Sequence, residues 1–219
     1  MAKSDAGMRP KKRKTLVYGI VGLIGLFLLY HAFYVVPLDA RAKDATDGDM
    51  QQLVEAYFSQ TLPVALQQAA EPCALMKALS AEESTAWAEY GRQTTIGNRY
   101  YFLLRGEGVV EEIGKDFIQV AFGADEQRCL VRISTVYIFG NEIRDASGEL
   151  LLQDIGELSK FNAISELINA KVRKEVVPAF LKQAQVGMKV QVDAALALNK
   201  RIGISEDLEI TPISLKVID

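Results

Sequence analysis

Residues 100–139 read YYFLLRGEGVVEEIGKDFIQVAFGADEQRCLVRISTVYIF. Within this segment, three stretches are rich in aromatic and β-branched residues, and turn-forming residues such as Gly114 separate them. The pattern predicts three consecutive antiparallel strands, over 100–113, 117–122 and 128–139. Gly106 and Gly108 lie inside the first stretch and indicate a bulge or a sharp coil in that strand.

The chain that follows returns to helical periodicity and then to alternation. Apolar residues recur at three- and four-residue steps through 160–184, and Gly187 ends this run. Further strands are predicted over 188–198 and 208–218. Three strands, a helix and two strands are the element order of the OB fold, a small five-stranded barrel. We therefore predict an α+β protein whose residues 97–219 form an OB-like antiparallel β-barrel, with a helix between strands three and four.

Residues 49–92 are predicted to form a helical subdomain before the barrel. Its first apolar run follows one face of a helix, and Pro63 is expected to kink that helix or divide it. A second helix is predicted over 72–90. Pro178 is expected to end or kink the later helix in the same way. Residues 141–155 lack a regular period and predict a long connection.

The N-terminal part has the pattern of a membrane anchor. Residues 15–36 contain no charged side chain, and a helix of this length spans roughly 33 Å, about the thickness of a bilayer's hydrocarbon core. Residues 1–14 form a basic tail, which favours a cytoplasmic N-terminus. Residues 37–48 are polar and predict a linker. The expected location is the bacterial inner membrane, with a single transmembrane helix and the bulk of the chain in the periplasm.

A cleaved signal peptide is the alternative to this anchor. Ala40-Arg41-Ala42 has the small-x-small form of a cleavage site after Ala42. The apolar run exceeds the roughly 7–15 residues of a signal core, and this length favours the uncleaved anchor.

Composition excludes several kinds of site. The 219 residues include 25 Lys or Arg, 28 Asp or Glu, two Cys and a single His, which is His31. Residues 37–219 therefore hold no His-based catalytic triad and no His-ligated zinc site. The net charge is -3 although the basic tail is positive, so the rest of the chain is acidic and unsuited to nucleic acid. We predict no cofactor, no metal and no nucleic-acid partner.

The densest polar cluster is Asn141-Glu142-Ile143-Arg144-Asp145, directly after the third predicted strand. As a recognition loop, it would offer the Arg144 guanidinium to a carboxylate, a phosphate or a sugar hydroxyl. As a structural element, Arg144 would pair with Asp145 or Glu142 and hold the loop in place. The candidate binding residues here are Asn141, Glu142, Arg144 and Asp145.

Cys73 and Cys129 are the only cysteines. Outside the cytoplasm a disulfide between them can form and persist, and it would tie the helical subdomain to the barrel. The alternative is that both are small buried hydrophobic side chains. The sequence leaves both open, because spacing along the chain does not determine disulfide geometry.

Several short motifs follow one another through residues 33–219. They include Val36-Pro37-Leu38, Leu62-Pro63, Arg105-Gly106-Glu107-Gly108-Val109-Val110, Gly140 with Ile143-Arg144-Asp145-Ala146, and Ile210-Thr211-Pro212. In these motifs the chain resembles an uncharacterised family of predicted bacterial periplasmic lipoproteins, often encoded beside sugar ABC importers. The resemblance implies a periplasmic location and a partner among the importer's proteins, such as its solute-binding protein or permease.

The chain also departs from that family. Lipoprotein members carry a lipid-bearing Cys just before the segment that matches Val35-Val36-Pro37, where this chain has Phe33-Tyr34. We therefore interpret the transmembrane helix as a replacement for the lipid anchor. Asp154 lies within the resemblance and joins the candidate binding residues. Many members have an Asn-Gln pair after that position, whereas this chain has Gly156-Glu157-Leu158.

These features predict a membrane-anchored periplasmic accessory protein of a carbohydrate importer that acts through protein–protein contacts and is not an enzyme. The first alternative is direct binding of a sugar or glycan, on aromatic platforms such as Tyr100, Tyr101 or Tyr137. The second is a carboxylate-based hydrolase that uses a carboxylate pair from Glu111, Glu112 and Asp116. These residues flank a turn at Gly114 that is normally solvated, and nothing else in the sequence demands catalysis.

Overall fold

The computed structural model describes Leu23 and residues 47–218, apart from residues 82–84, 95–96, 125–127 and 206–207. The predicted basic tail 1–14, the predicted transmembrane segment 15–36 apart from Leu23, and most of the linker lie outside the described residues. Among the helices that are described, none is both long enough and apolar enough to span a bilayer. The segments predicted as a helical subdomain and as a barrel belong to one compact unit.

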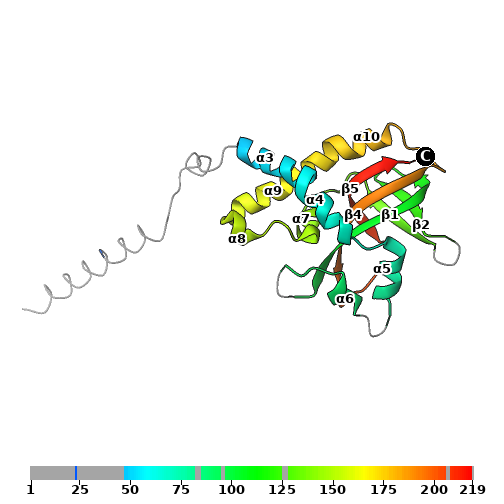
Figure 1. The fold of residues 1–219 in the computed structure, drawn as a ribbon, viewed down its shortest axis with the longest axis horizontal. Coiled ribbons are helices and arrows are strands. Elements are labelled where there is room, and N and C mark those ends of the chain that lie inside the picture. Colours follow the sequence, from blue (N-terminus) through cyan, green and yellow to red (C-terminus); the bar gives the residue numbers. More distant parts are fainter. Residues whose placement is uncertain are drawn as a thin grey trace, which may run out of the picture. The chain divides into compact units, whose positions relative to one another are not determined.

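Five strands close into a barrel in the order β1-β2-β3-β5-β4 (Figure 1). Their bounds are β1 Arg99–Ile113, β2 Phe117–Phe122, β3 Cys129–Ser134, β4 Lys189–Asn199 and β5 Glu209–Val217. Neighbouring strands are antiparallel except β3 and β5, which run parallel. The prediction of a wholly antiparallel barrel was therefore wrong. Directions cannot alternate all the way around a closed ring of five strands, so at least one pair must be parallel.

The long strand β1 closes the barrel because it pairs with two neighbours. It pairs with β4 from Arg99 to Val109 and with β2 from Gly108 onward. A register shift marks a bulge just beyond Gly108, between Val110 and Glu112. A Cβ on Gly108 would lie 2.6 Å from the backbone oxygen of Ala121, so this glycine permits the close approach of β2.

We expect Gly108→Ala to lower the free energy of unfolding by about 1–3 kcal/mol, because the added methyl group overlaps a backbone atom that only a shift of β2 can move. Urea unfolding of the purified protein measures this loss. Glu107→Ala, at an exposed position on the same strand, is the control, with an expected change within about 0.5 kcal/mol. Equal stability of the two variants would contradict the steric role of Gly108.

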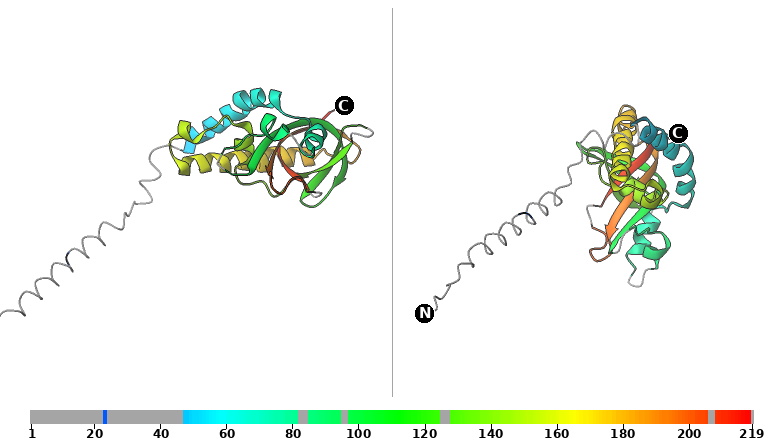
Figure 2. Two further views of the ribbon diagram at one scale, coloured as in Figure 1. Left: turned by 90° about the horizontal axis from the view of Figure 1, so that it is seen from below. Right: turned by 90° about the vertical axis from the view of Figure 1, so that its left-hand side faces the viewer.

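The helices come in two groups. The first group precedes the barrel and comprises α3 Asp47–Ala56, η1 Tyr57–Thr61, α4 Leu62–Ala65, η2 Leu66–Gln68, α5 Pro72–Leu79 and α6 Ala86–Glu89. The second lies between β3 and β4 and comprises α7 Glu142–Ser147, α8 Leu152–Ile155, α9 Leu158–Lys171, η4 Val172–Val176 and α10 Val177–Leu181. From α9 to α10 the chain is one continuous helix that passes β5, and α3 packs on α9 (Figure 2).

Two prolines lie inside helices that continue through them. The π-helical turns η1 and η4 each end two residues before a proline, Pro63 and Pro178. A proline nitrogen donates no hydrogen bond, and its ring crowds the carbonyl four residues earlier. The wider π turn relieves this crowding. The kink or break expected at each proline is therefore a local widening of the helix.

Three predicted segments differ from the structure. The helix predicted over 72–90 is two helices, α5 and α6. The connection predicted over 141–155 contains α7, whose residues are mostly buried and packed against the barrel and α9. The third strand ends at Ser134 rather than at Phe139, and the residues after Ser134 leave the sheet as a loop.

Candidate functional site

Arg144 and Asp145 form a buried ion pair on α7. Arg144 Nη2 lies 2.7 Å from Asp145 Oδ1, and Arg144 Nε donates to the same oxygen at 2.8 Å. The two residues are only 5% and 3% exposed. Of the two roles considered for Arg144, the structure forms the pair that holds the chain in place, and the partner is Asp145.

The other donors of Arg144 reach α9. Arg144 Nη1 donates to Ser165 Oγ at 2.7 Å and to the backbone oxygen of Phe161 at 3.2 Å. The guanidinium carbon lies 3.5 Å from the centroid of the Phe161 ring. A guanidinium that recognises an external ligand presents its fork to that ligand. Here the fork is used within the protein, so Arg144 joins α7 to α9.

The remaining oxygen of Asp145 is also used internally. Asp145 Oδ2 accepts from Asn141 Nδ2 and, at 3.3 Å, from Thr94 Oγ1. Asn141 Nδ2 also donates to Tyr101 Oη at 3.2 Å. Tyr101 is buried and therefore presents no platform for a sugar. This network ties α7 to β1 and to the segment before it.

The other two predicted binding residues are placed differently. Glu142 accepts from Thr211 Oγ1 at 2.5 Å and pairs with Arg99 at 3.3 Å, so it joins α7 to β5 and β1. Asp154 lies apart from this cluster, exposed on α8. The structure thus gathers four of the five candidates at α7 and separates the fifth.

A small pocket of about 420 Å³ opens beside this cluster. Its described lining is Gly140, Asn141, Arg144, Asn162, Ser165 and Glu166. These residues supply amide, hydroxyl and carboxylate groups, but no aromatic ring among those described residues lines the pocket. Direct sugar binding was predicted to combine such polar groups with an aromatic platform, and this pocket supplies only the polar half.

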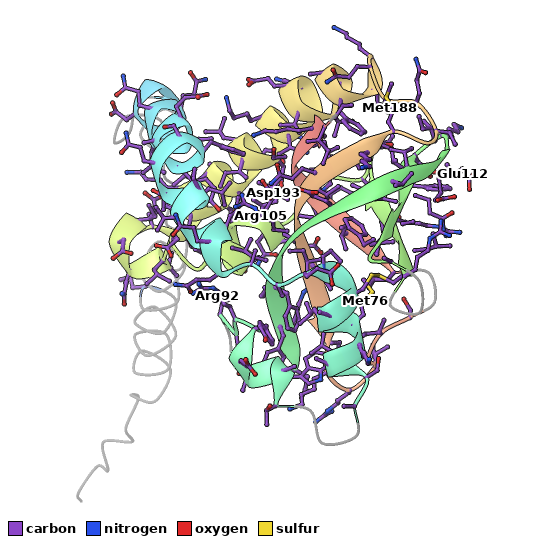
Figure 3. All side chains as sticks on the ribbon, turned by 45° about the vertical axis from the view of Figure 1, so that its right-hand side comes forward. Met76, Arg92, Arg105, Glu112, Met188 and Asp193 are labelled. Atoms are coloured by element: carbon purple, nitrogen blue, oxygen red, sulfur yellow. A yellow bond between two sulfur atoms is a disulfide. The ribbon has the colours of Figure 1, made fainter. Side chains whose placement is uncertain are left out.

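A second ion pair, in which the Asp193 carboxylate is buried and the Arg105 side chain is partly exposed, connects two barrel strands. Arg105 on β1 lies directly opposite Asp193 on β4, and Figure 3 shows the two side chains together. Arg105 Nε donates to Asp193 Oδ1 at 2.6 Å and Arg105 Nη2 to Asp193 Oδ2 at 3.1 Å. These hydrogen bonds raise the pKa of Arg105 further above its ordinary value. The pair favours the register of β1 on β4, and sequence reasoning did not single it out.

A disulfide joins Cys73 on α5 to Cys129 on β3, with 5.6 Å between their Cα atoms. Of the two alternatives for the cysteines, the structure forms the bridge. The bridge borders an open groove of about 890 Å³ between α5 and the β2–β3 end of the barrel. It ties the first group of helices to the barrel.

The loop between β3 and α7 exposes several apolar side chains. Val136, Tyr137 and Phe139 are 52%, 59% and 64% exposed, whereas Ile138 between them is fully buried. We call these three exposed residues the apolar knuckle. Sequence reasoning named Tyr137 as a possible platform for a sugar, but it missed the three-residue surface because the apolar run was interpreted as the end of the third strand. The only signal for it was a run of apolar residues that fails to alternate.

Hydrogen bonds hold the backbone of this loop. Ser134 Oγ accepts from the Tyr137 N–H and donates to the Tyr137 carbonyl, both at 3.2 Å. From the long helix, Arg173 Nη1 donates to the Ile138 carbonyl, and Asn169 Nδ2 donates to the Gly140 carbonyl at 2.8 Å. The loop is therefore held from both sides while three apolar side chains face the solvent.

Comparison with known proteins gives a family and a fold. A family model described as a predicted periplasmic lipoprotein (DUF2291) matches residues 23–216. A search of curated proteins finds no match. Among solved structures, an OB-fold protein from Thermotoga maritima MSB8 is 23% identical, with a TM-score of 0.69, over 77% of this chain and 98% of that one. This likeness confirms the OB-like barrel and bears on the fold alone.

Proposed function

Because the chain belongs to the DUF2291 family of predicted periplasmic lipoproteins, we propose that it is a periplasmic accessory protein that binds a partner protein through the apolar knuckle. The observation that supports this proposal is the held loop, which keeps Val136, Tyr137 and Phe139 in water. Exposed aromatic side chains on a preorganised backbone are typical of the residues that dominate protein–protein affinity.

Preorganisation explains why this small surface is sufficient. A flexible loop loses conformational entropy when it binds, and that loss reduces affinity. Four hydrogen bonds with the side chains of Ser134, Asn169 and Arg173 hold this loop before any partner arrives. Burial of Ile138 under the loop adds a further attachment. Contact with a partner would therefore bury aromatic area with little additional ordering.

The proposed partner is the solute-binding protein or the permease of a carbohydrate ABC importer. This part of the proposal rests on the family resemblance, which implies a gene position beside sugar importers. The proposed anchor is the apolar segment 15–36, which would hold the domain at the periplasmic face of the inner membrane, within reach of a permease. The proposed activity is binding and involves no turnover of substrate.

The α7 cluster has a supporting role in this proposal. The same helix that receives Arg144 also carries Asn169 and Arg173, which hold the knuckle. Arg144 and Asp145 therefore stabilise the base of the interface rather than contacting the partner. The proposed contact is made by Tyr137 and Phe139 and not by the recognition loop predicted around Arg144.

The test is cross-linking of the full-length protein in intact membranes, with Tyr137→Ser/Phe139→Ser compared with the wild type. Loss of two central aromatic side chains costs about 2 kcal/mol or more in protein interfaces, so we expect capture of the importer subunit to fall at least roughly 30-fold. Ile202→Ser is the matched control, because Ile202 is an exposed apolar residue outside the knuckle. Equal capture by the knuckle variant and the wild type would refute the assignment of this surface.

A further inference from the structure

Three exposed leucines lie where α8 joins α9. Leu151 and Leu152 are at the start of α8, and Leu158 is the first residue of α9. They are 40%, 42% and 60% exposed. We call these three residues the leucine end. Exposure of leucine side chains to water is unfavourable in free energy. A group of exposed leucines therefore indicates a surface that binds a partner or a membrane.

The described domain also begins at this end. α3 starts at Asp47 and packs on α9, and Figures 1 and 2 show its start at the same end of the domain as α8. The continuous helix runs away from this end, from Leu158 to Leu181, over roughly 35 Å. The leucine end is therefore the end at which the polypeptide enters the domain.

The length of the linker limits how far this end can lie from the lipid. Ten residues, 37–46, separate the apolar segment 15–36 from Asp47. Ten residues reach at most about 35 Å even when fully extended. This step rests on the proposed membrane anchor. A surface tethered so closely meets the bilayer at a high effective concentration, so even a weak affinity would keep it bound.

We propose that the leucine end lies on the lipid surface, with Leu151, Leu152 and Leu158 at the level of the headgroups and upper acyl chains. Leucine is one of the residues with which interfacial helices enter this boundary. The contact would also limit how far the apolar knuckle can stand above the membrane surface. Arg173, which holds the knuckle loop, lies 15 residues along the helix from Leu158, so it stands at most about 22 Å above that end.

The charges around the leucines indicate the type of lipid. Glu149, Asp154 and Glu157 are exposed acidic residues near them, and Lys160 is paired with Glu157 at 3.6 Å. Binding to anionic lipids uses clusters of Lys and Arg, which this end does not present among its described residues. The surface therefore fits zwitterionic headgroups. In this arrangement the exposed Asp154 would lie at the edge of the membrane contact.

The test uses the full-length protein in phosphatidylcholine vesicles whose acyl chains carry bromine, which quenches tryptophan fluorescence on contact. Trp87→Phe removes the only native tryptophan. Leu152→Trp and Leu158→Trp are then introduced one at a time. Val186→Trp is the control, because Val186 is exposed and lies beyond the far end of the long helix. We expect at least twofold stronger quenching at positions 152 and 158 than at position 186.

The possible outcomes separate this inference from the proposed function. Equal quenching at the three positions in vesicle-bound protein would refute the lipid contact and leave the proposed anchor intact. Failure of the full-length protein to float with the vesicles would refute the anchor itself, and this inference with it. Quenching that is absent in these vesicles, together with a protein cross-link at position 152 in native membranes, would replace the lipid with a protein occupant.

Discussion

Arg144→Ala is expected to lower the free energy of unfolding by about 3–5 kcal/mol, because it leaves the Asp145 carboxylate buried without its cation. The change also removes the hydrogen bonds to Ser165 and Phe161, which join α7 to α9. For a domain of this size the loss corresponds to a fall in Tm of roughly 10 °C. Thermal and urea unfolding of the purified protein measure it.

Arg99→Ala is the matched control for this variant. Arg99 also pairs with a carboxylate of α7, Glu142, but its side chain is 55% exposed. Ion pairs at the surface contribute about 0–1 kcal/mol, so the control should lose far less stability than Arg144→Ala. An Arg144→Ala/Asp145→Ala double variant should lose less than the sum of the two single variants, because it leaves no unpaired charge. If Arg99→Ala and Arg144→Ala lowered the free energy of unfolding by similar amounts, the stabilising role of the buried pair would be contradicted.

Loss of stability and loss of partner binding are distinguishable in this protein. If a variant of Arg144 lost the proposed partner, destabilisation of the domain beneath the proposed interface would account for the loss. Tyr137 and Phe139 are exposed, so their replacement leaves the core intact and reports on the contact itself. We therefore expect replacement of Arg144 to lower both the free energy of unfolding and the cross-linked yield of the partner. Replacement of Tyr137 and Phe139 should lower the cross-linked yield alone.

The Cys73→Ala/Cys129→Ala double variant is expected to lose about 4 kcal/mol of stability. The bridge spans 56 residues, and in the chain-entropy model a loop of this length restricts the unfolded chain by that amount. Urea unfolding of the double variant and of the wild type measures the difference. Hydrogen exchange of α5 should also become faster in the double variant, because the bridge attaches this helix to β3.

Chemical reduction of the wild type provides an independent check. Reduced wild type and the double variant should unfold at the same urea concentration, since both lack the same covalent constraint. A wild type whose unfolding midpoint is unchanged by a reductant would show that the bridge does not contribute to stability. The reduced protein should still fold, because reduction leaves the large buried side chains of the barrel core, Phe102, Phe122 and Ile133, in place.

Local patterns in the sequence determined most of the barrel. The strand predicted over 117–122 has those bounds in the structure, and β1, β4 and β5 differ from their predictions by one residue at one or both ends. Alternation of apolar and polar residues is a property of neighbouring residues, so it can be read without the fold. The order of the elements then indicated an OB-like barrel, and the motifs indicated the family.

Tertiary contacts decided the parts that carry the candidate site. The sequence of 141–155 has no helical period, yet α7 forms because the buried pair of Arg144 and Asp145 draws that segment against α9 and β1. The apolar run after Ser134 favoured a longer strand, but Asn169 and Arg173 hold it as a loop. Those two side chains lie 29 and 35 residues further along the chain than the carbonyls they bind, beyond the range of any local pattern.

The sequence by itself determined four of the five barrel strands, the long helix and the family, because each depends on the order and period of nearby residues. Only the tertiary structure decided that β3 runs parallel to β5, that Cys73 joins Cys129, and that three apolar side chains of one loop remain in water. Each of these depends on which distant segments meet. These tertiary contacts are determined by the closure of the barrel and the packing of the helices on it, and not by local periodicity.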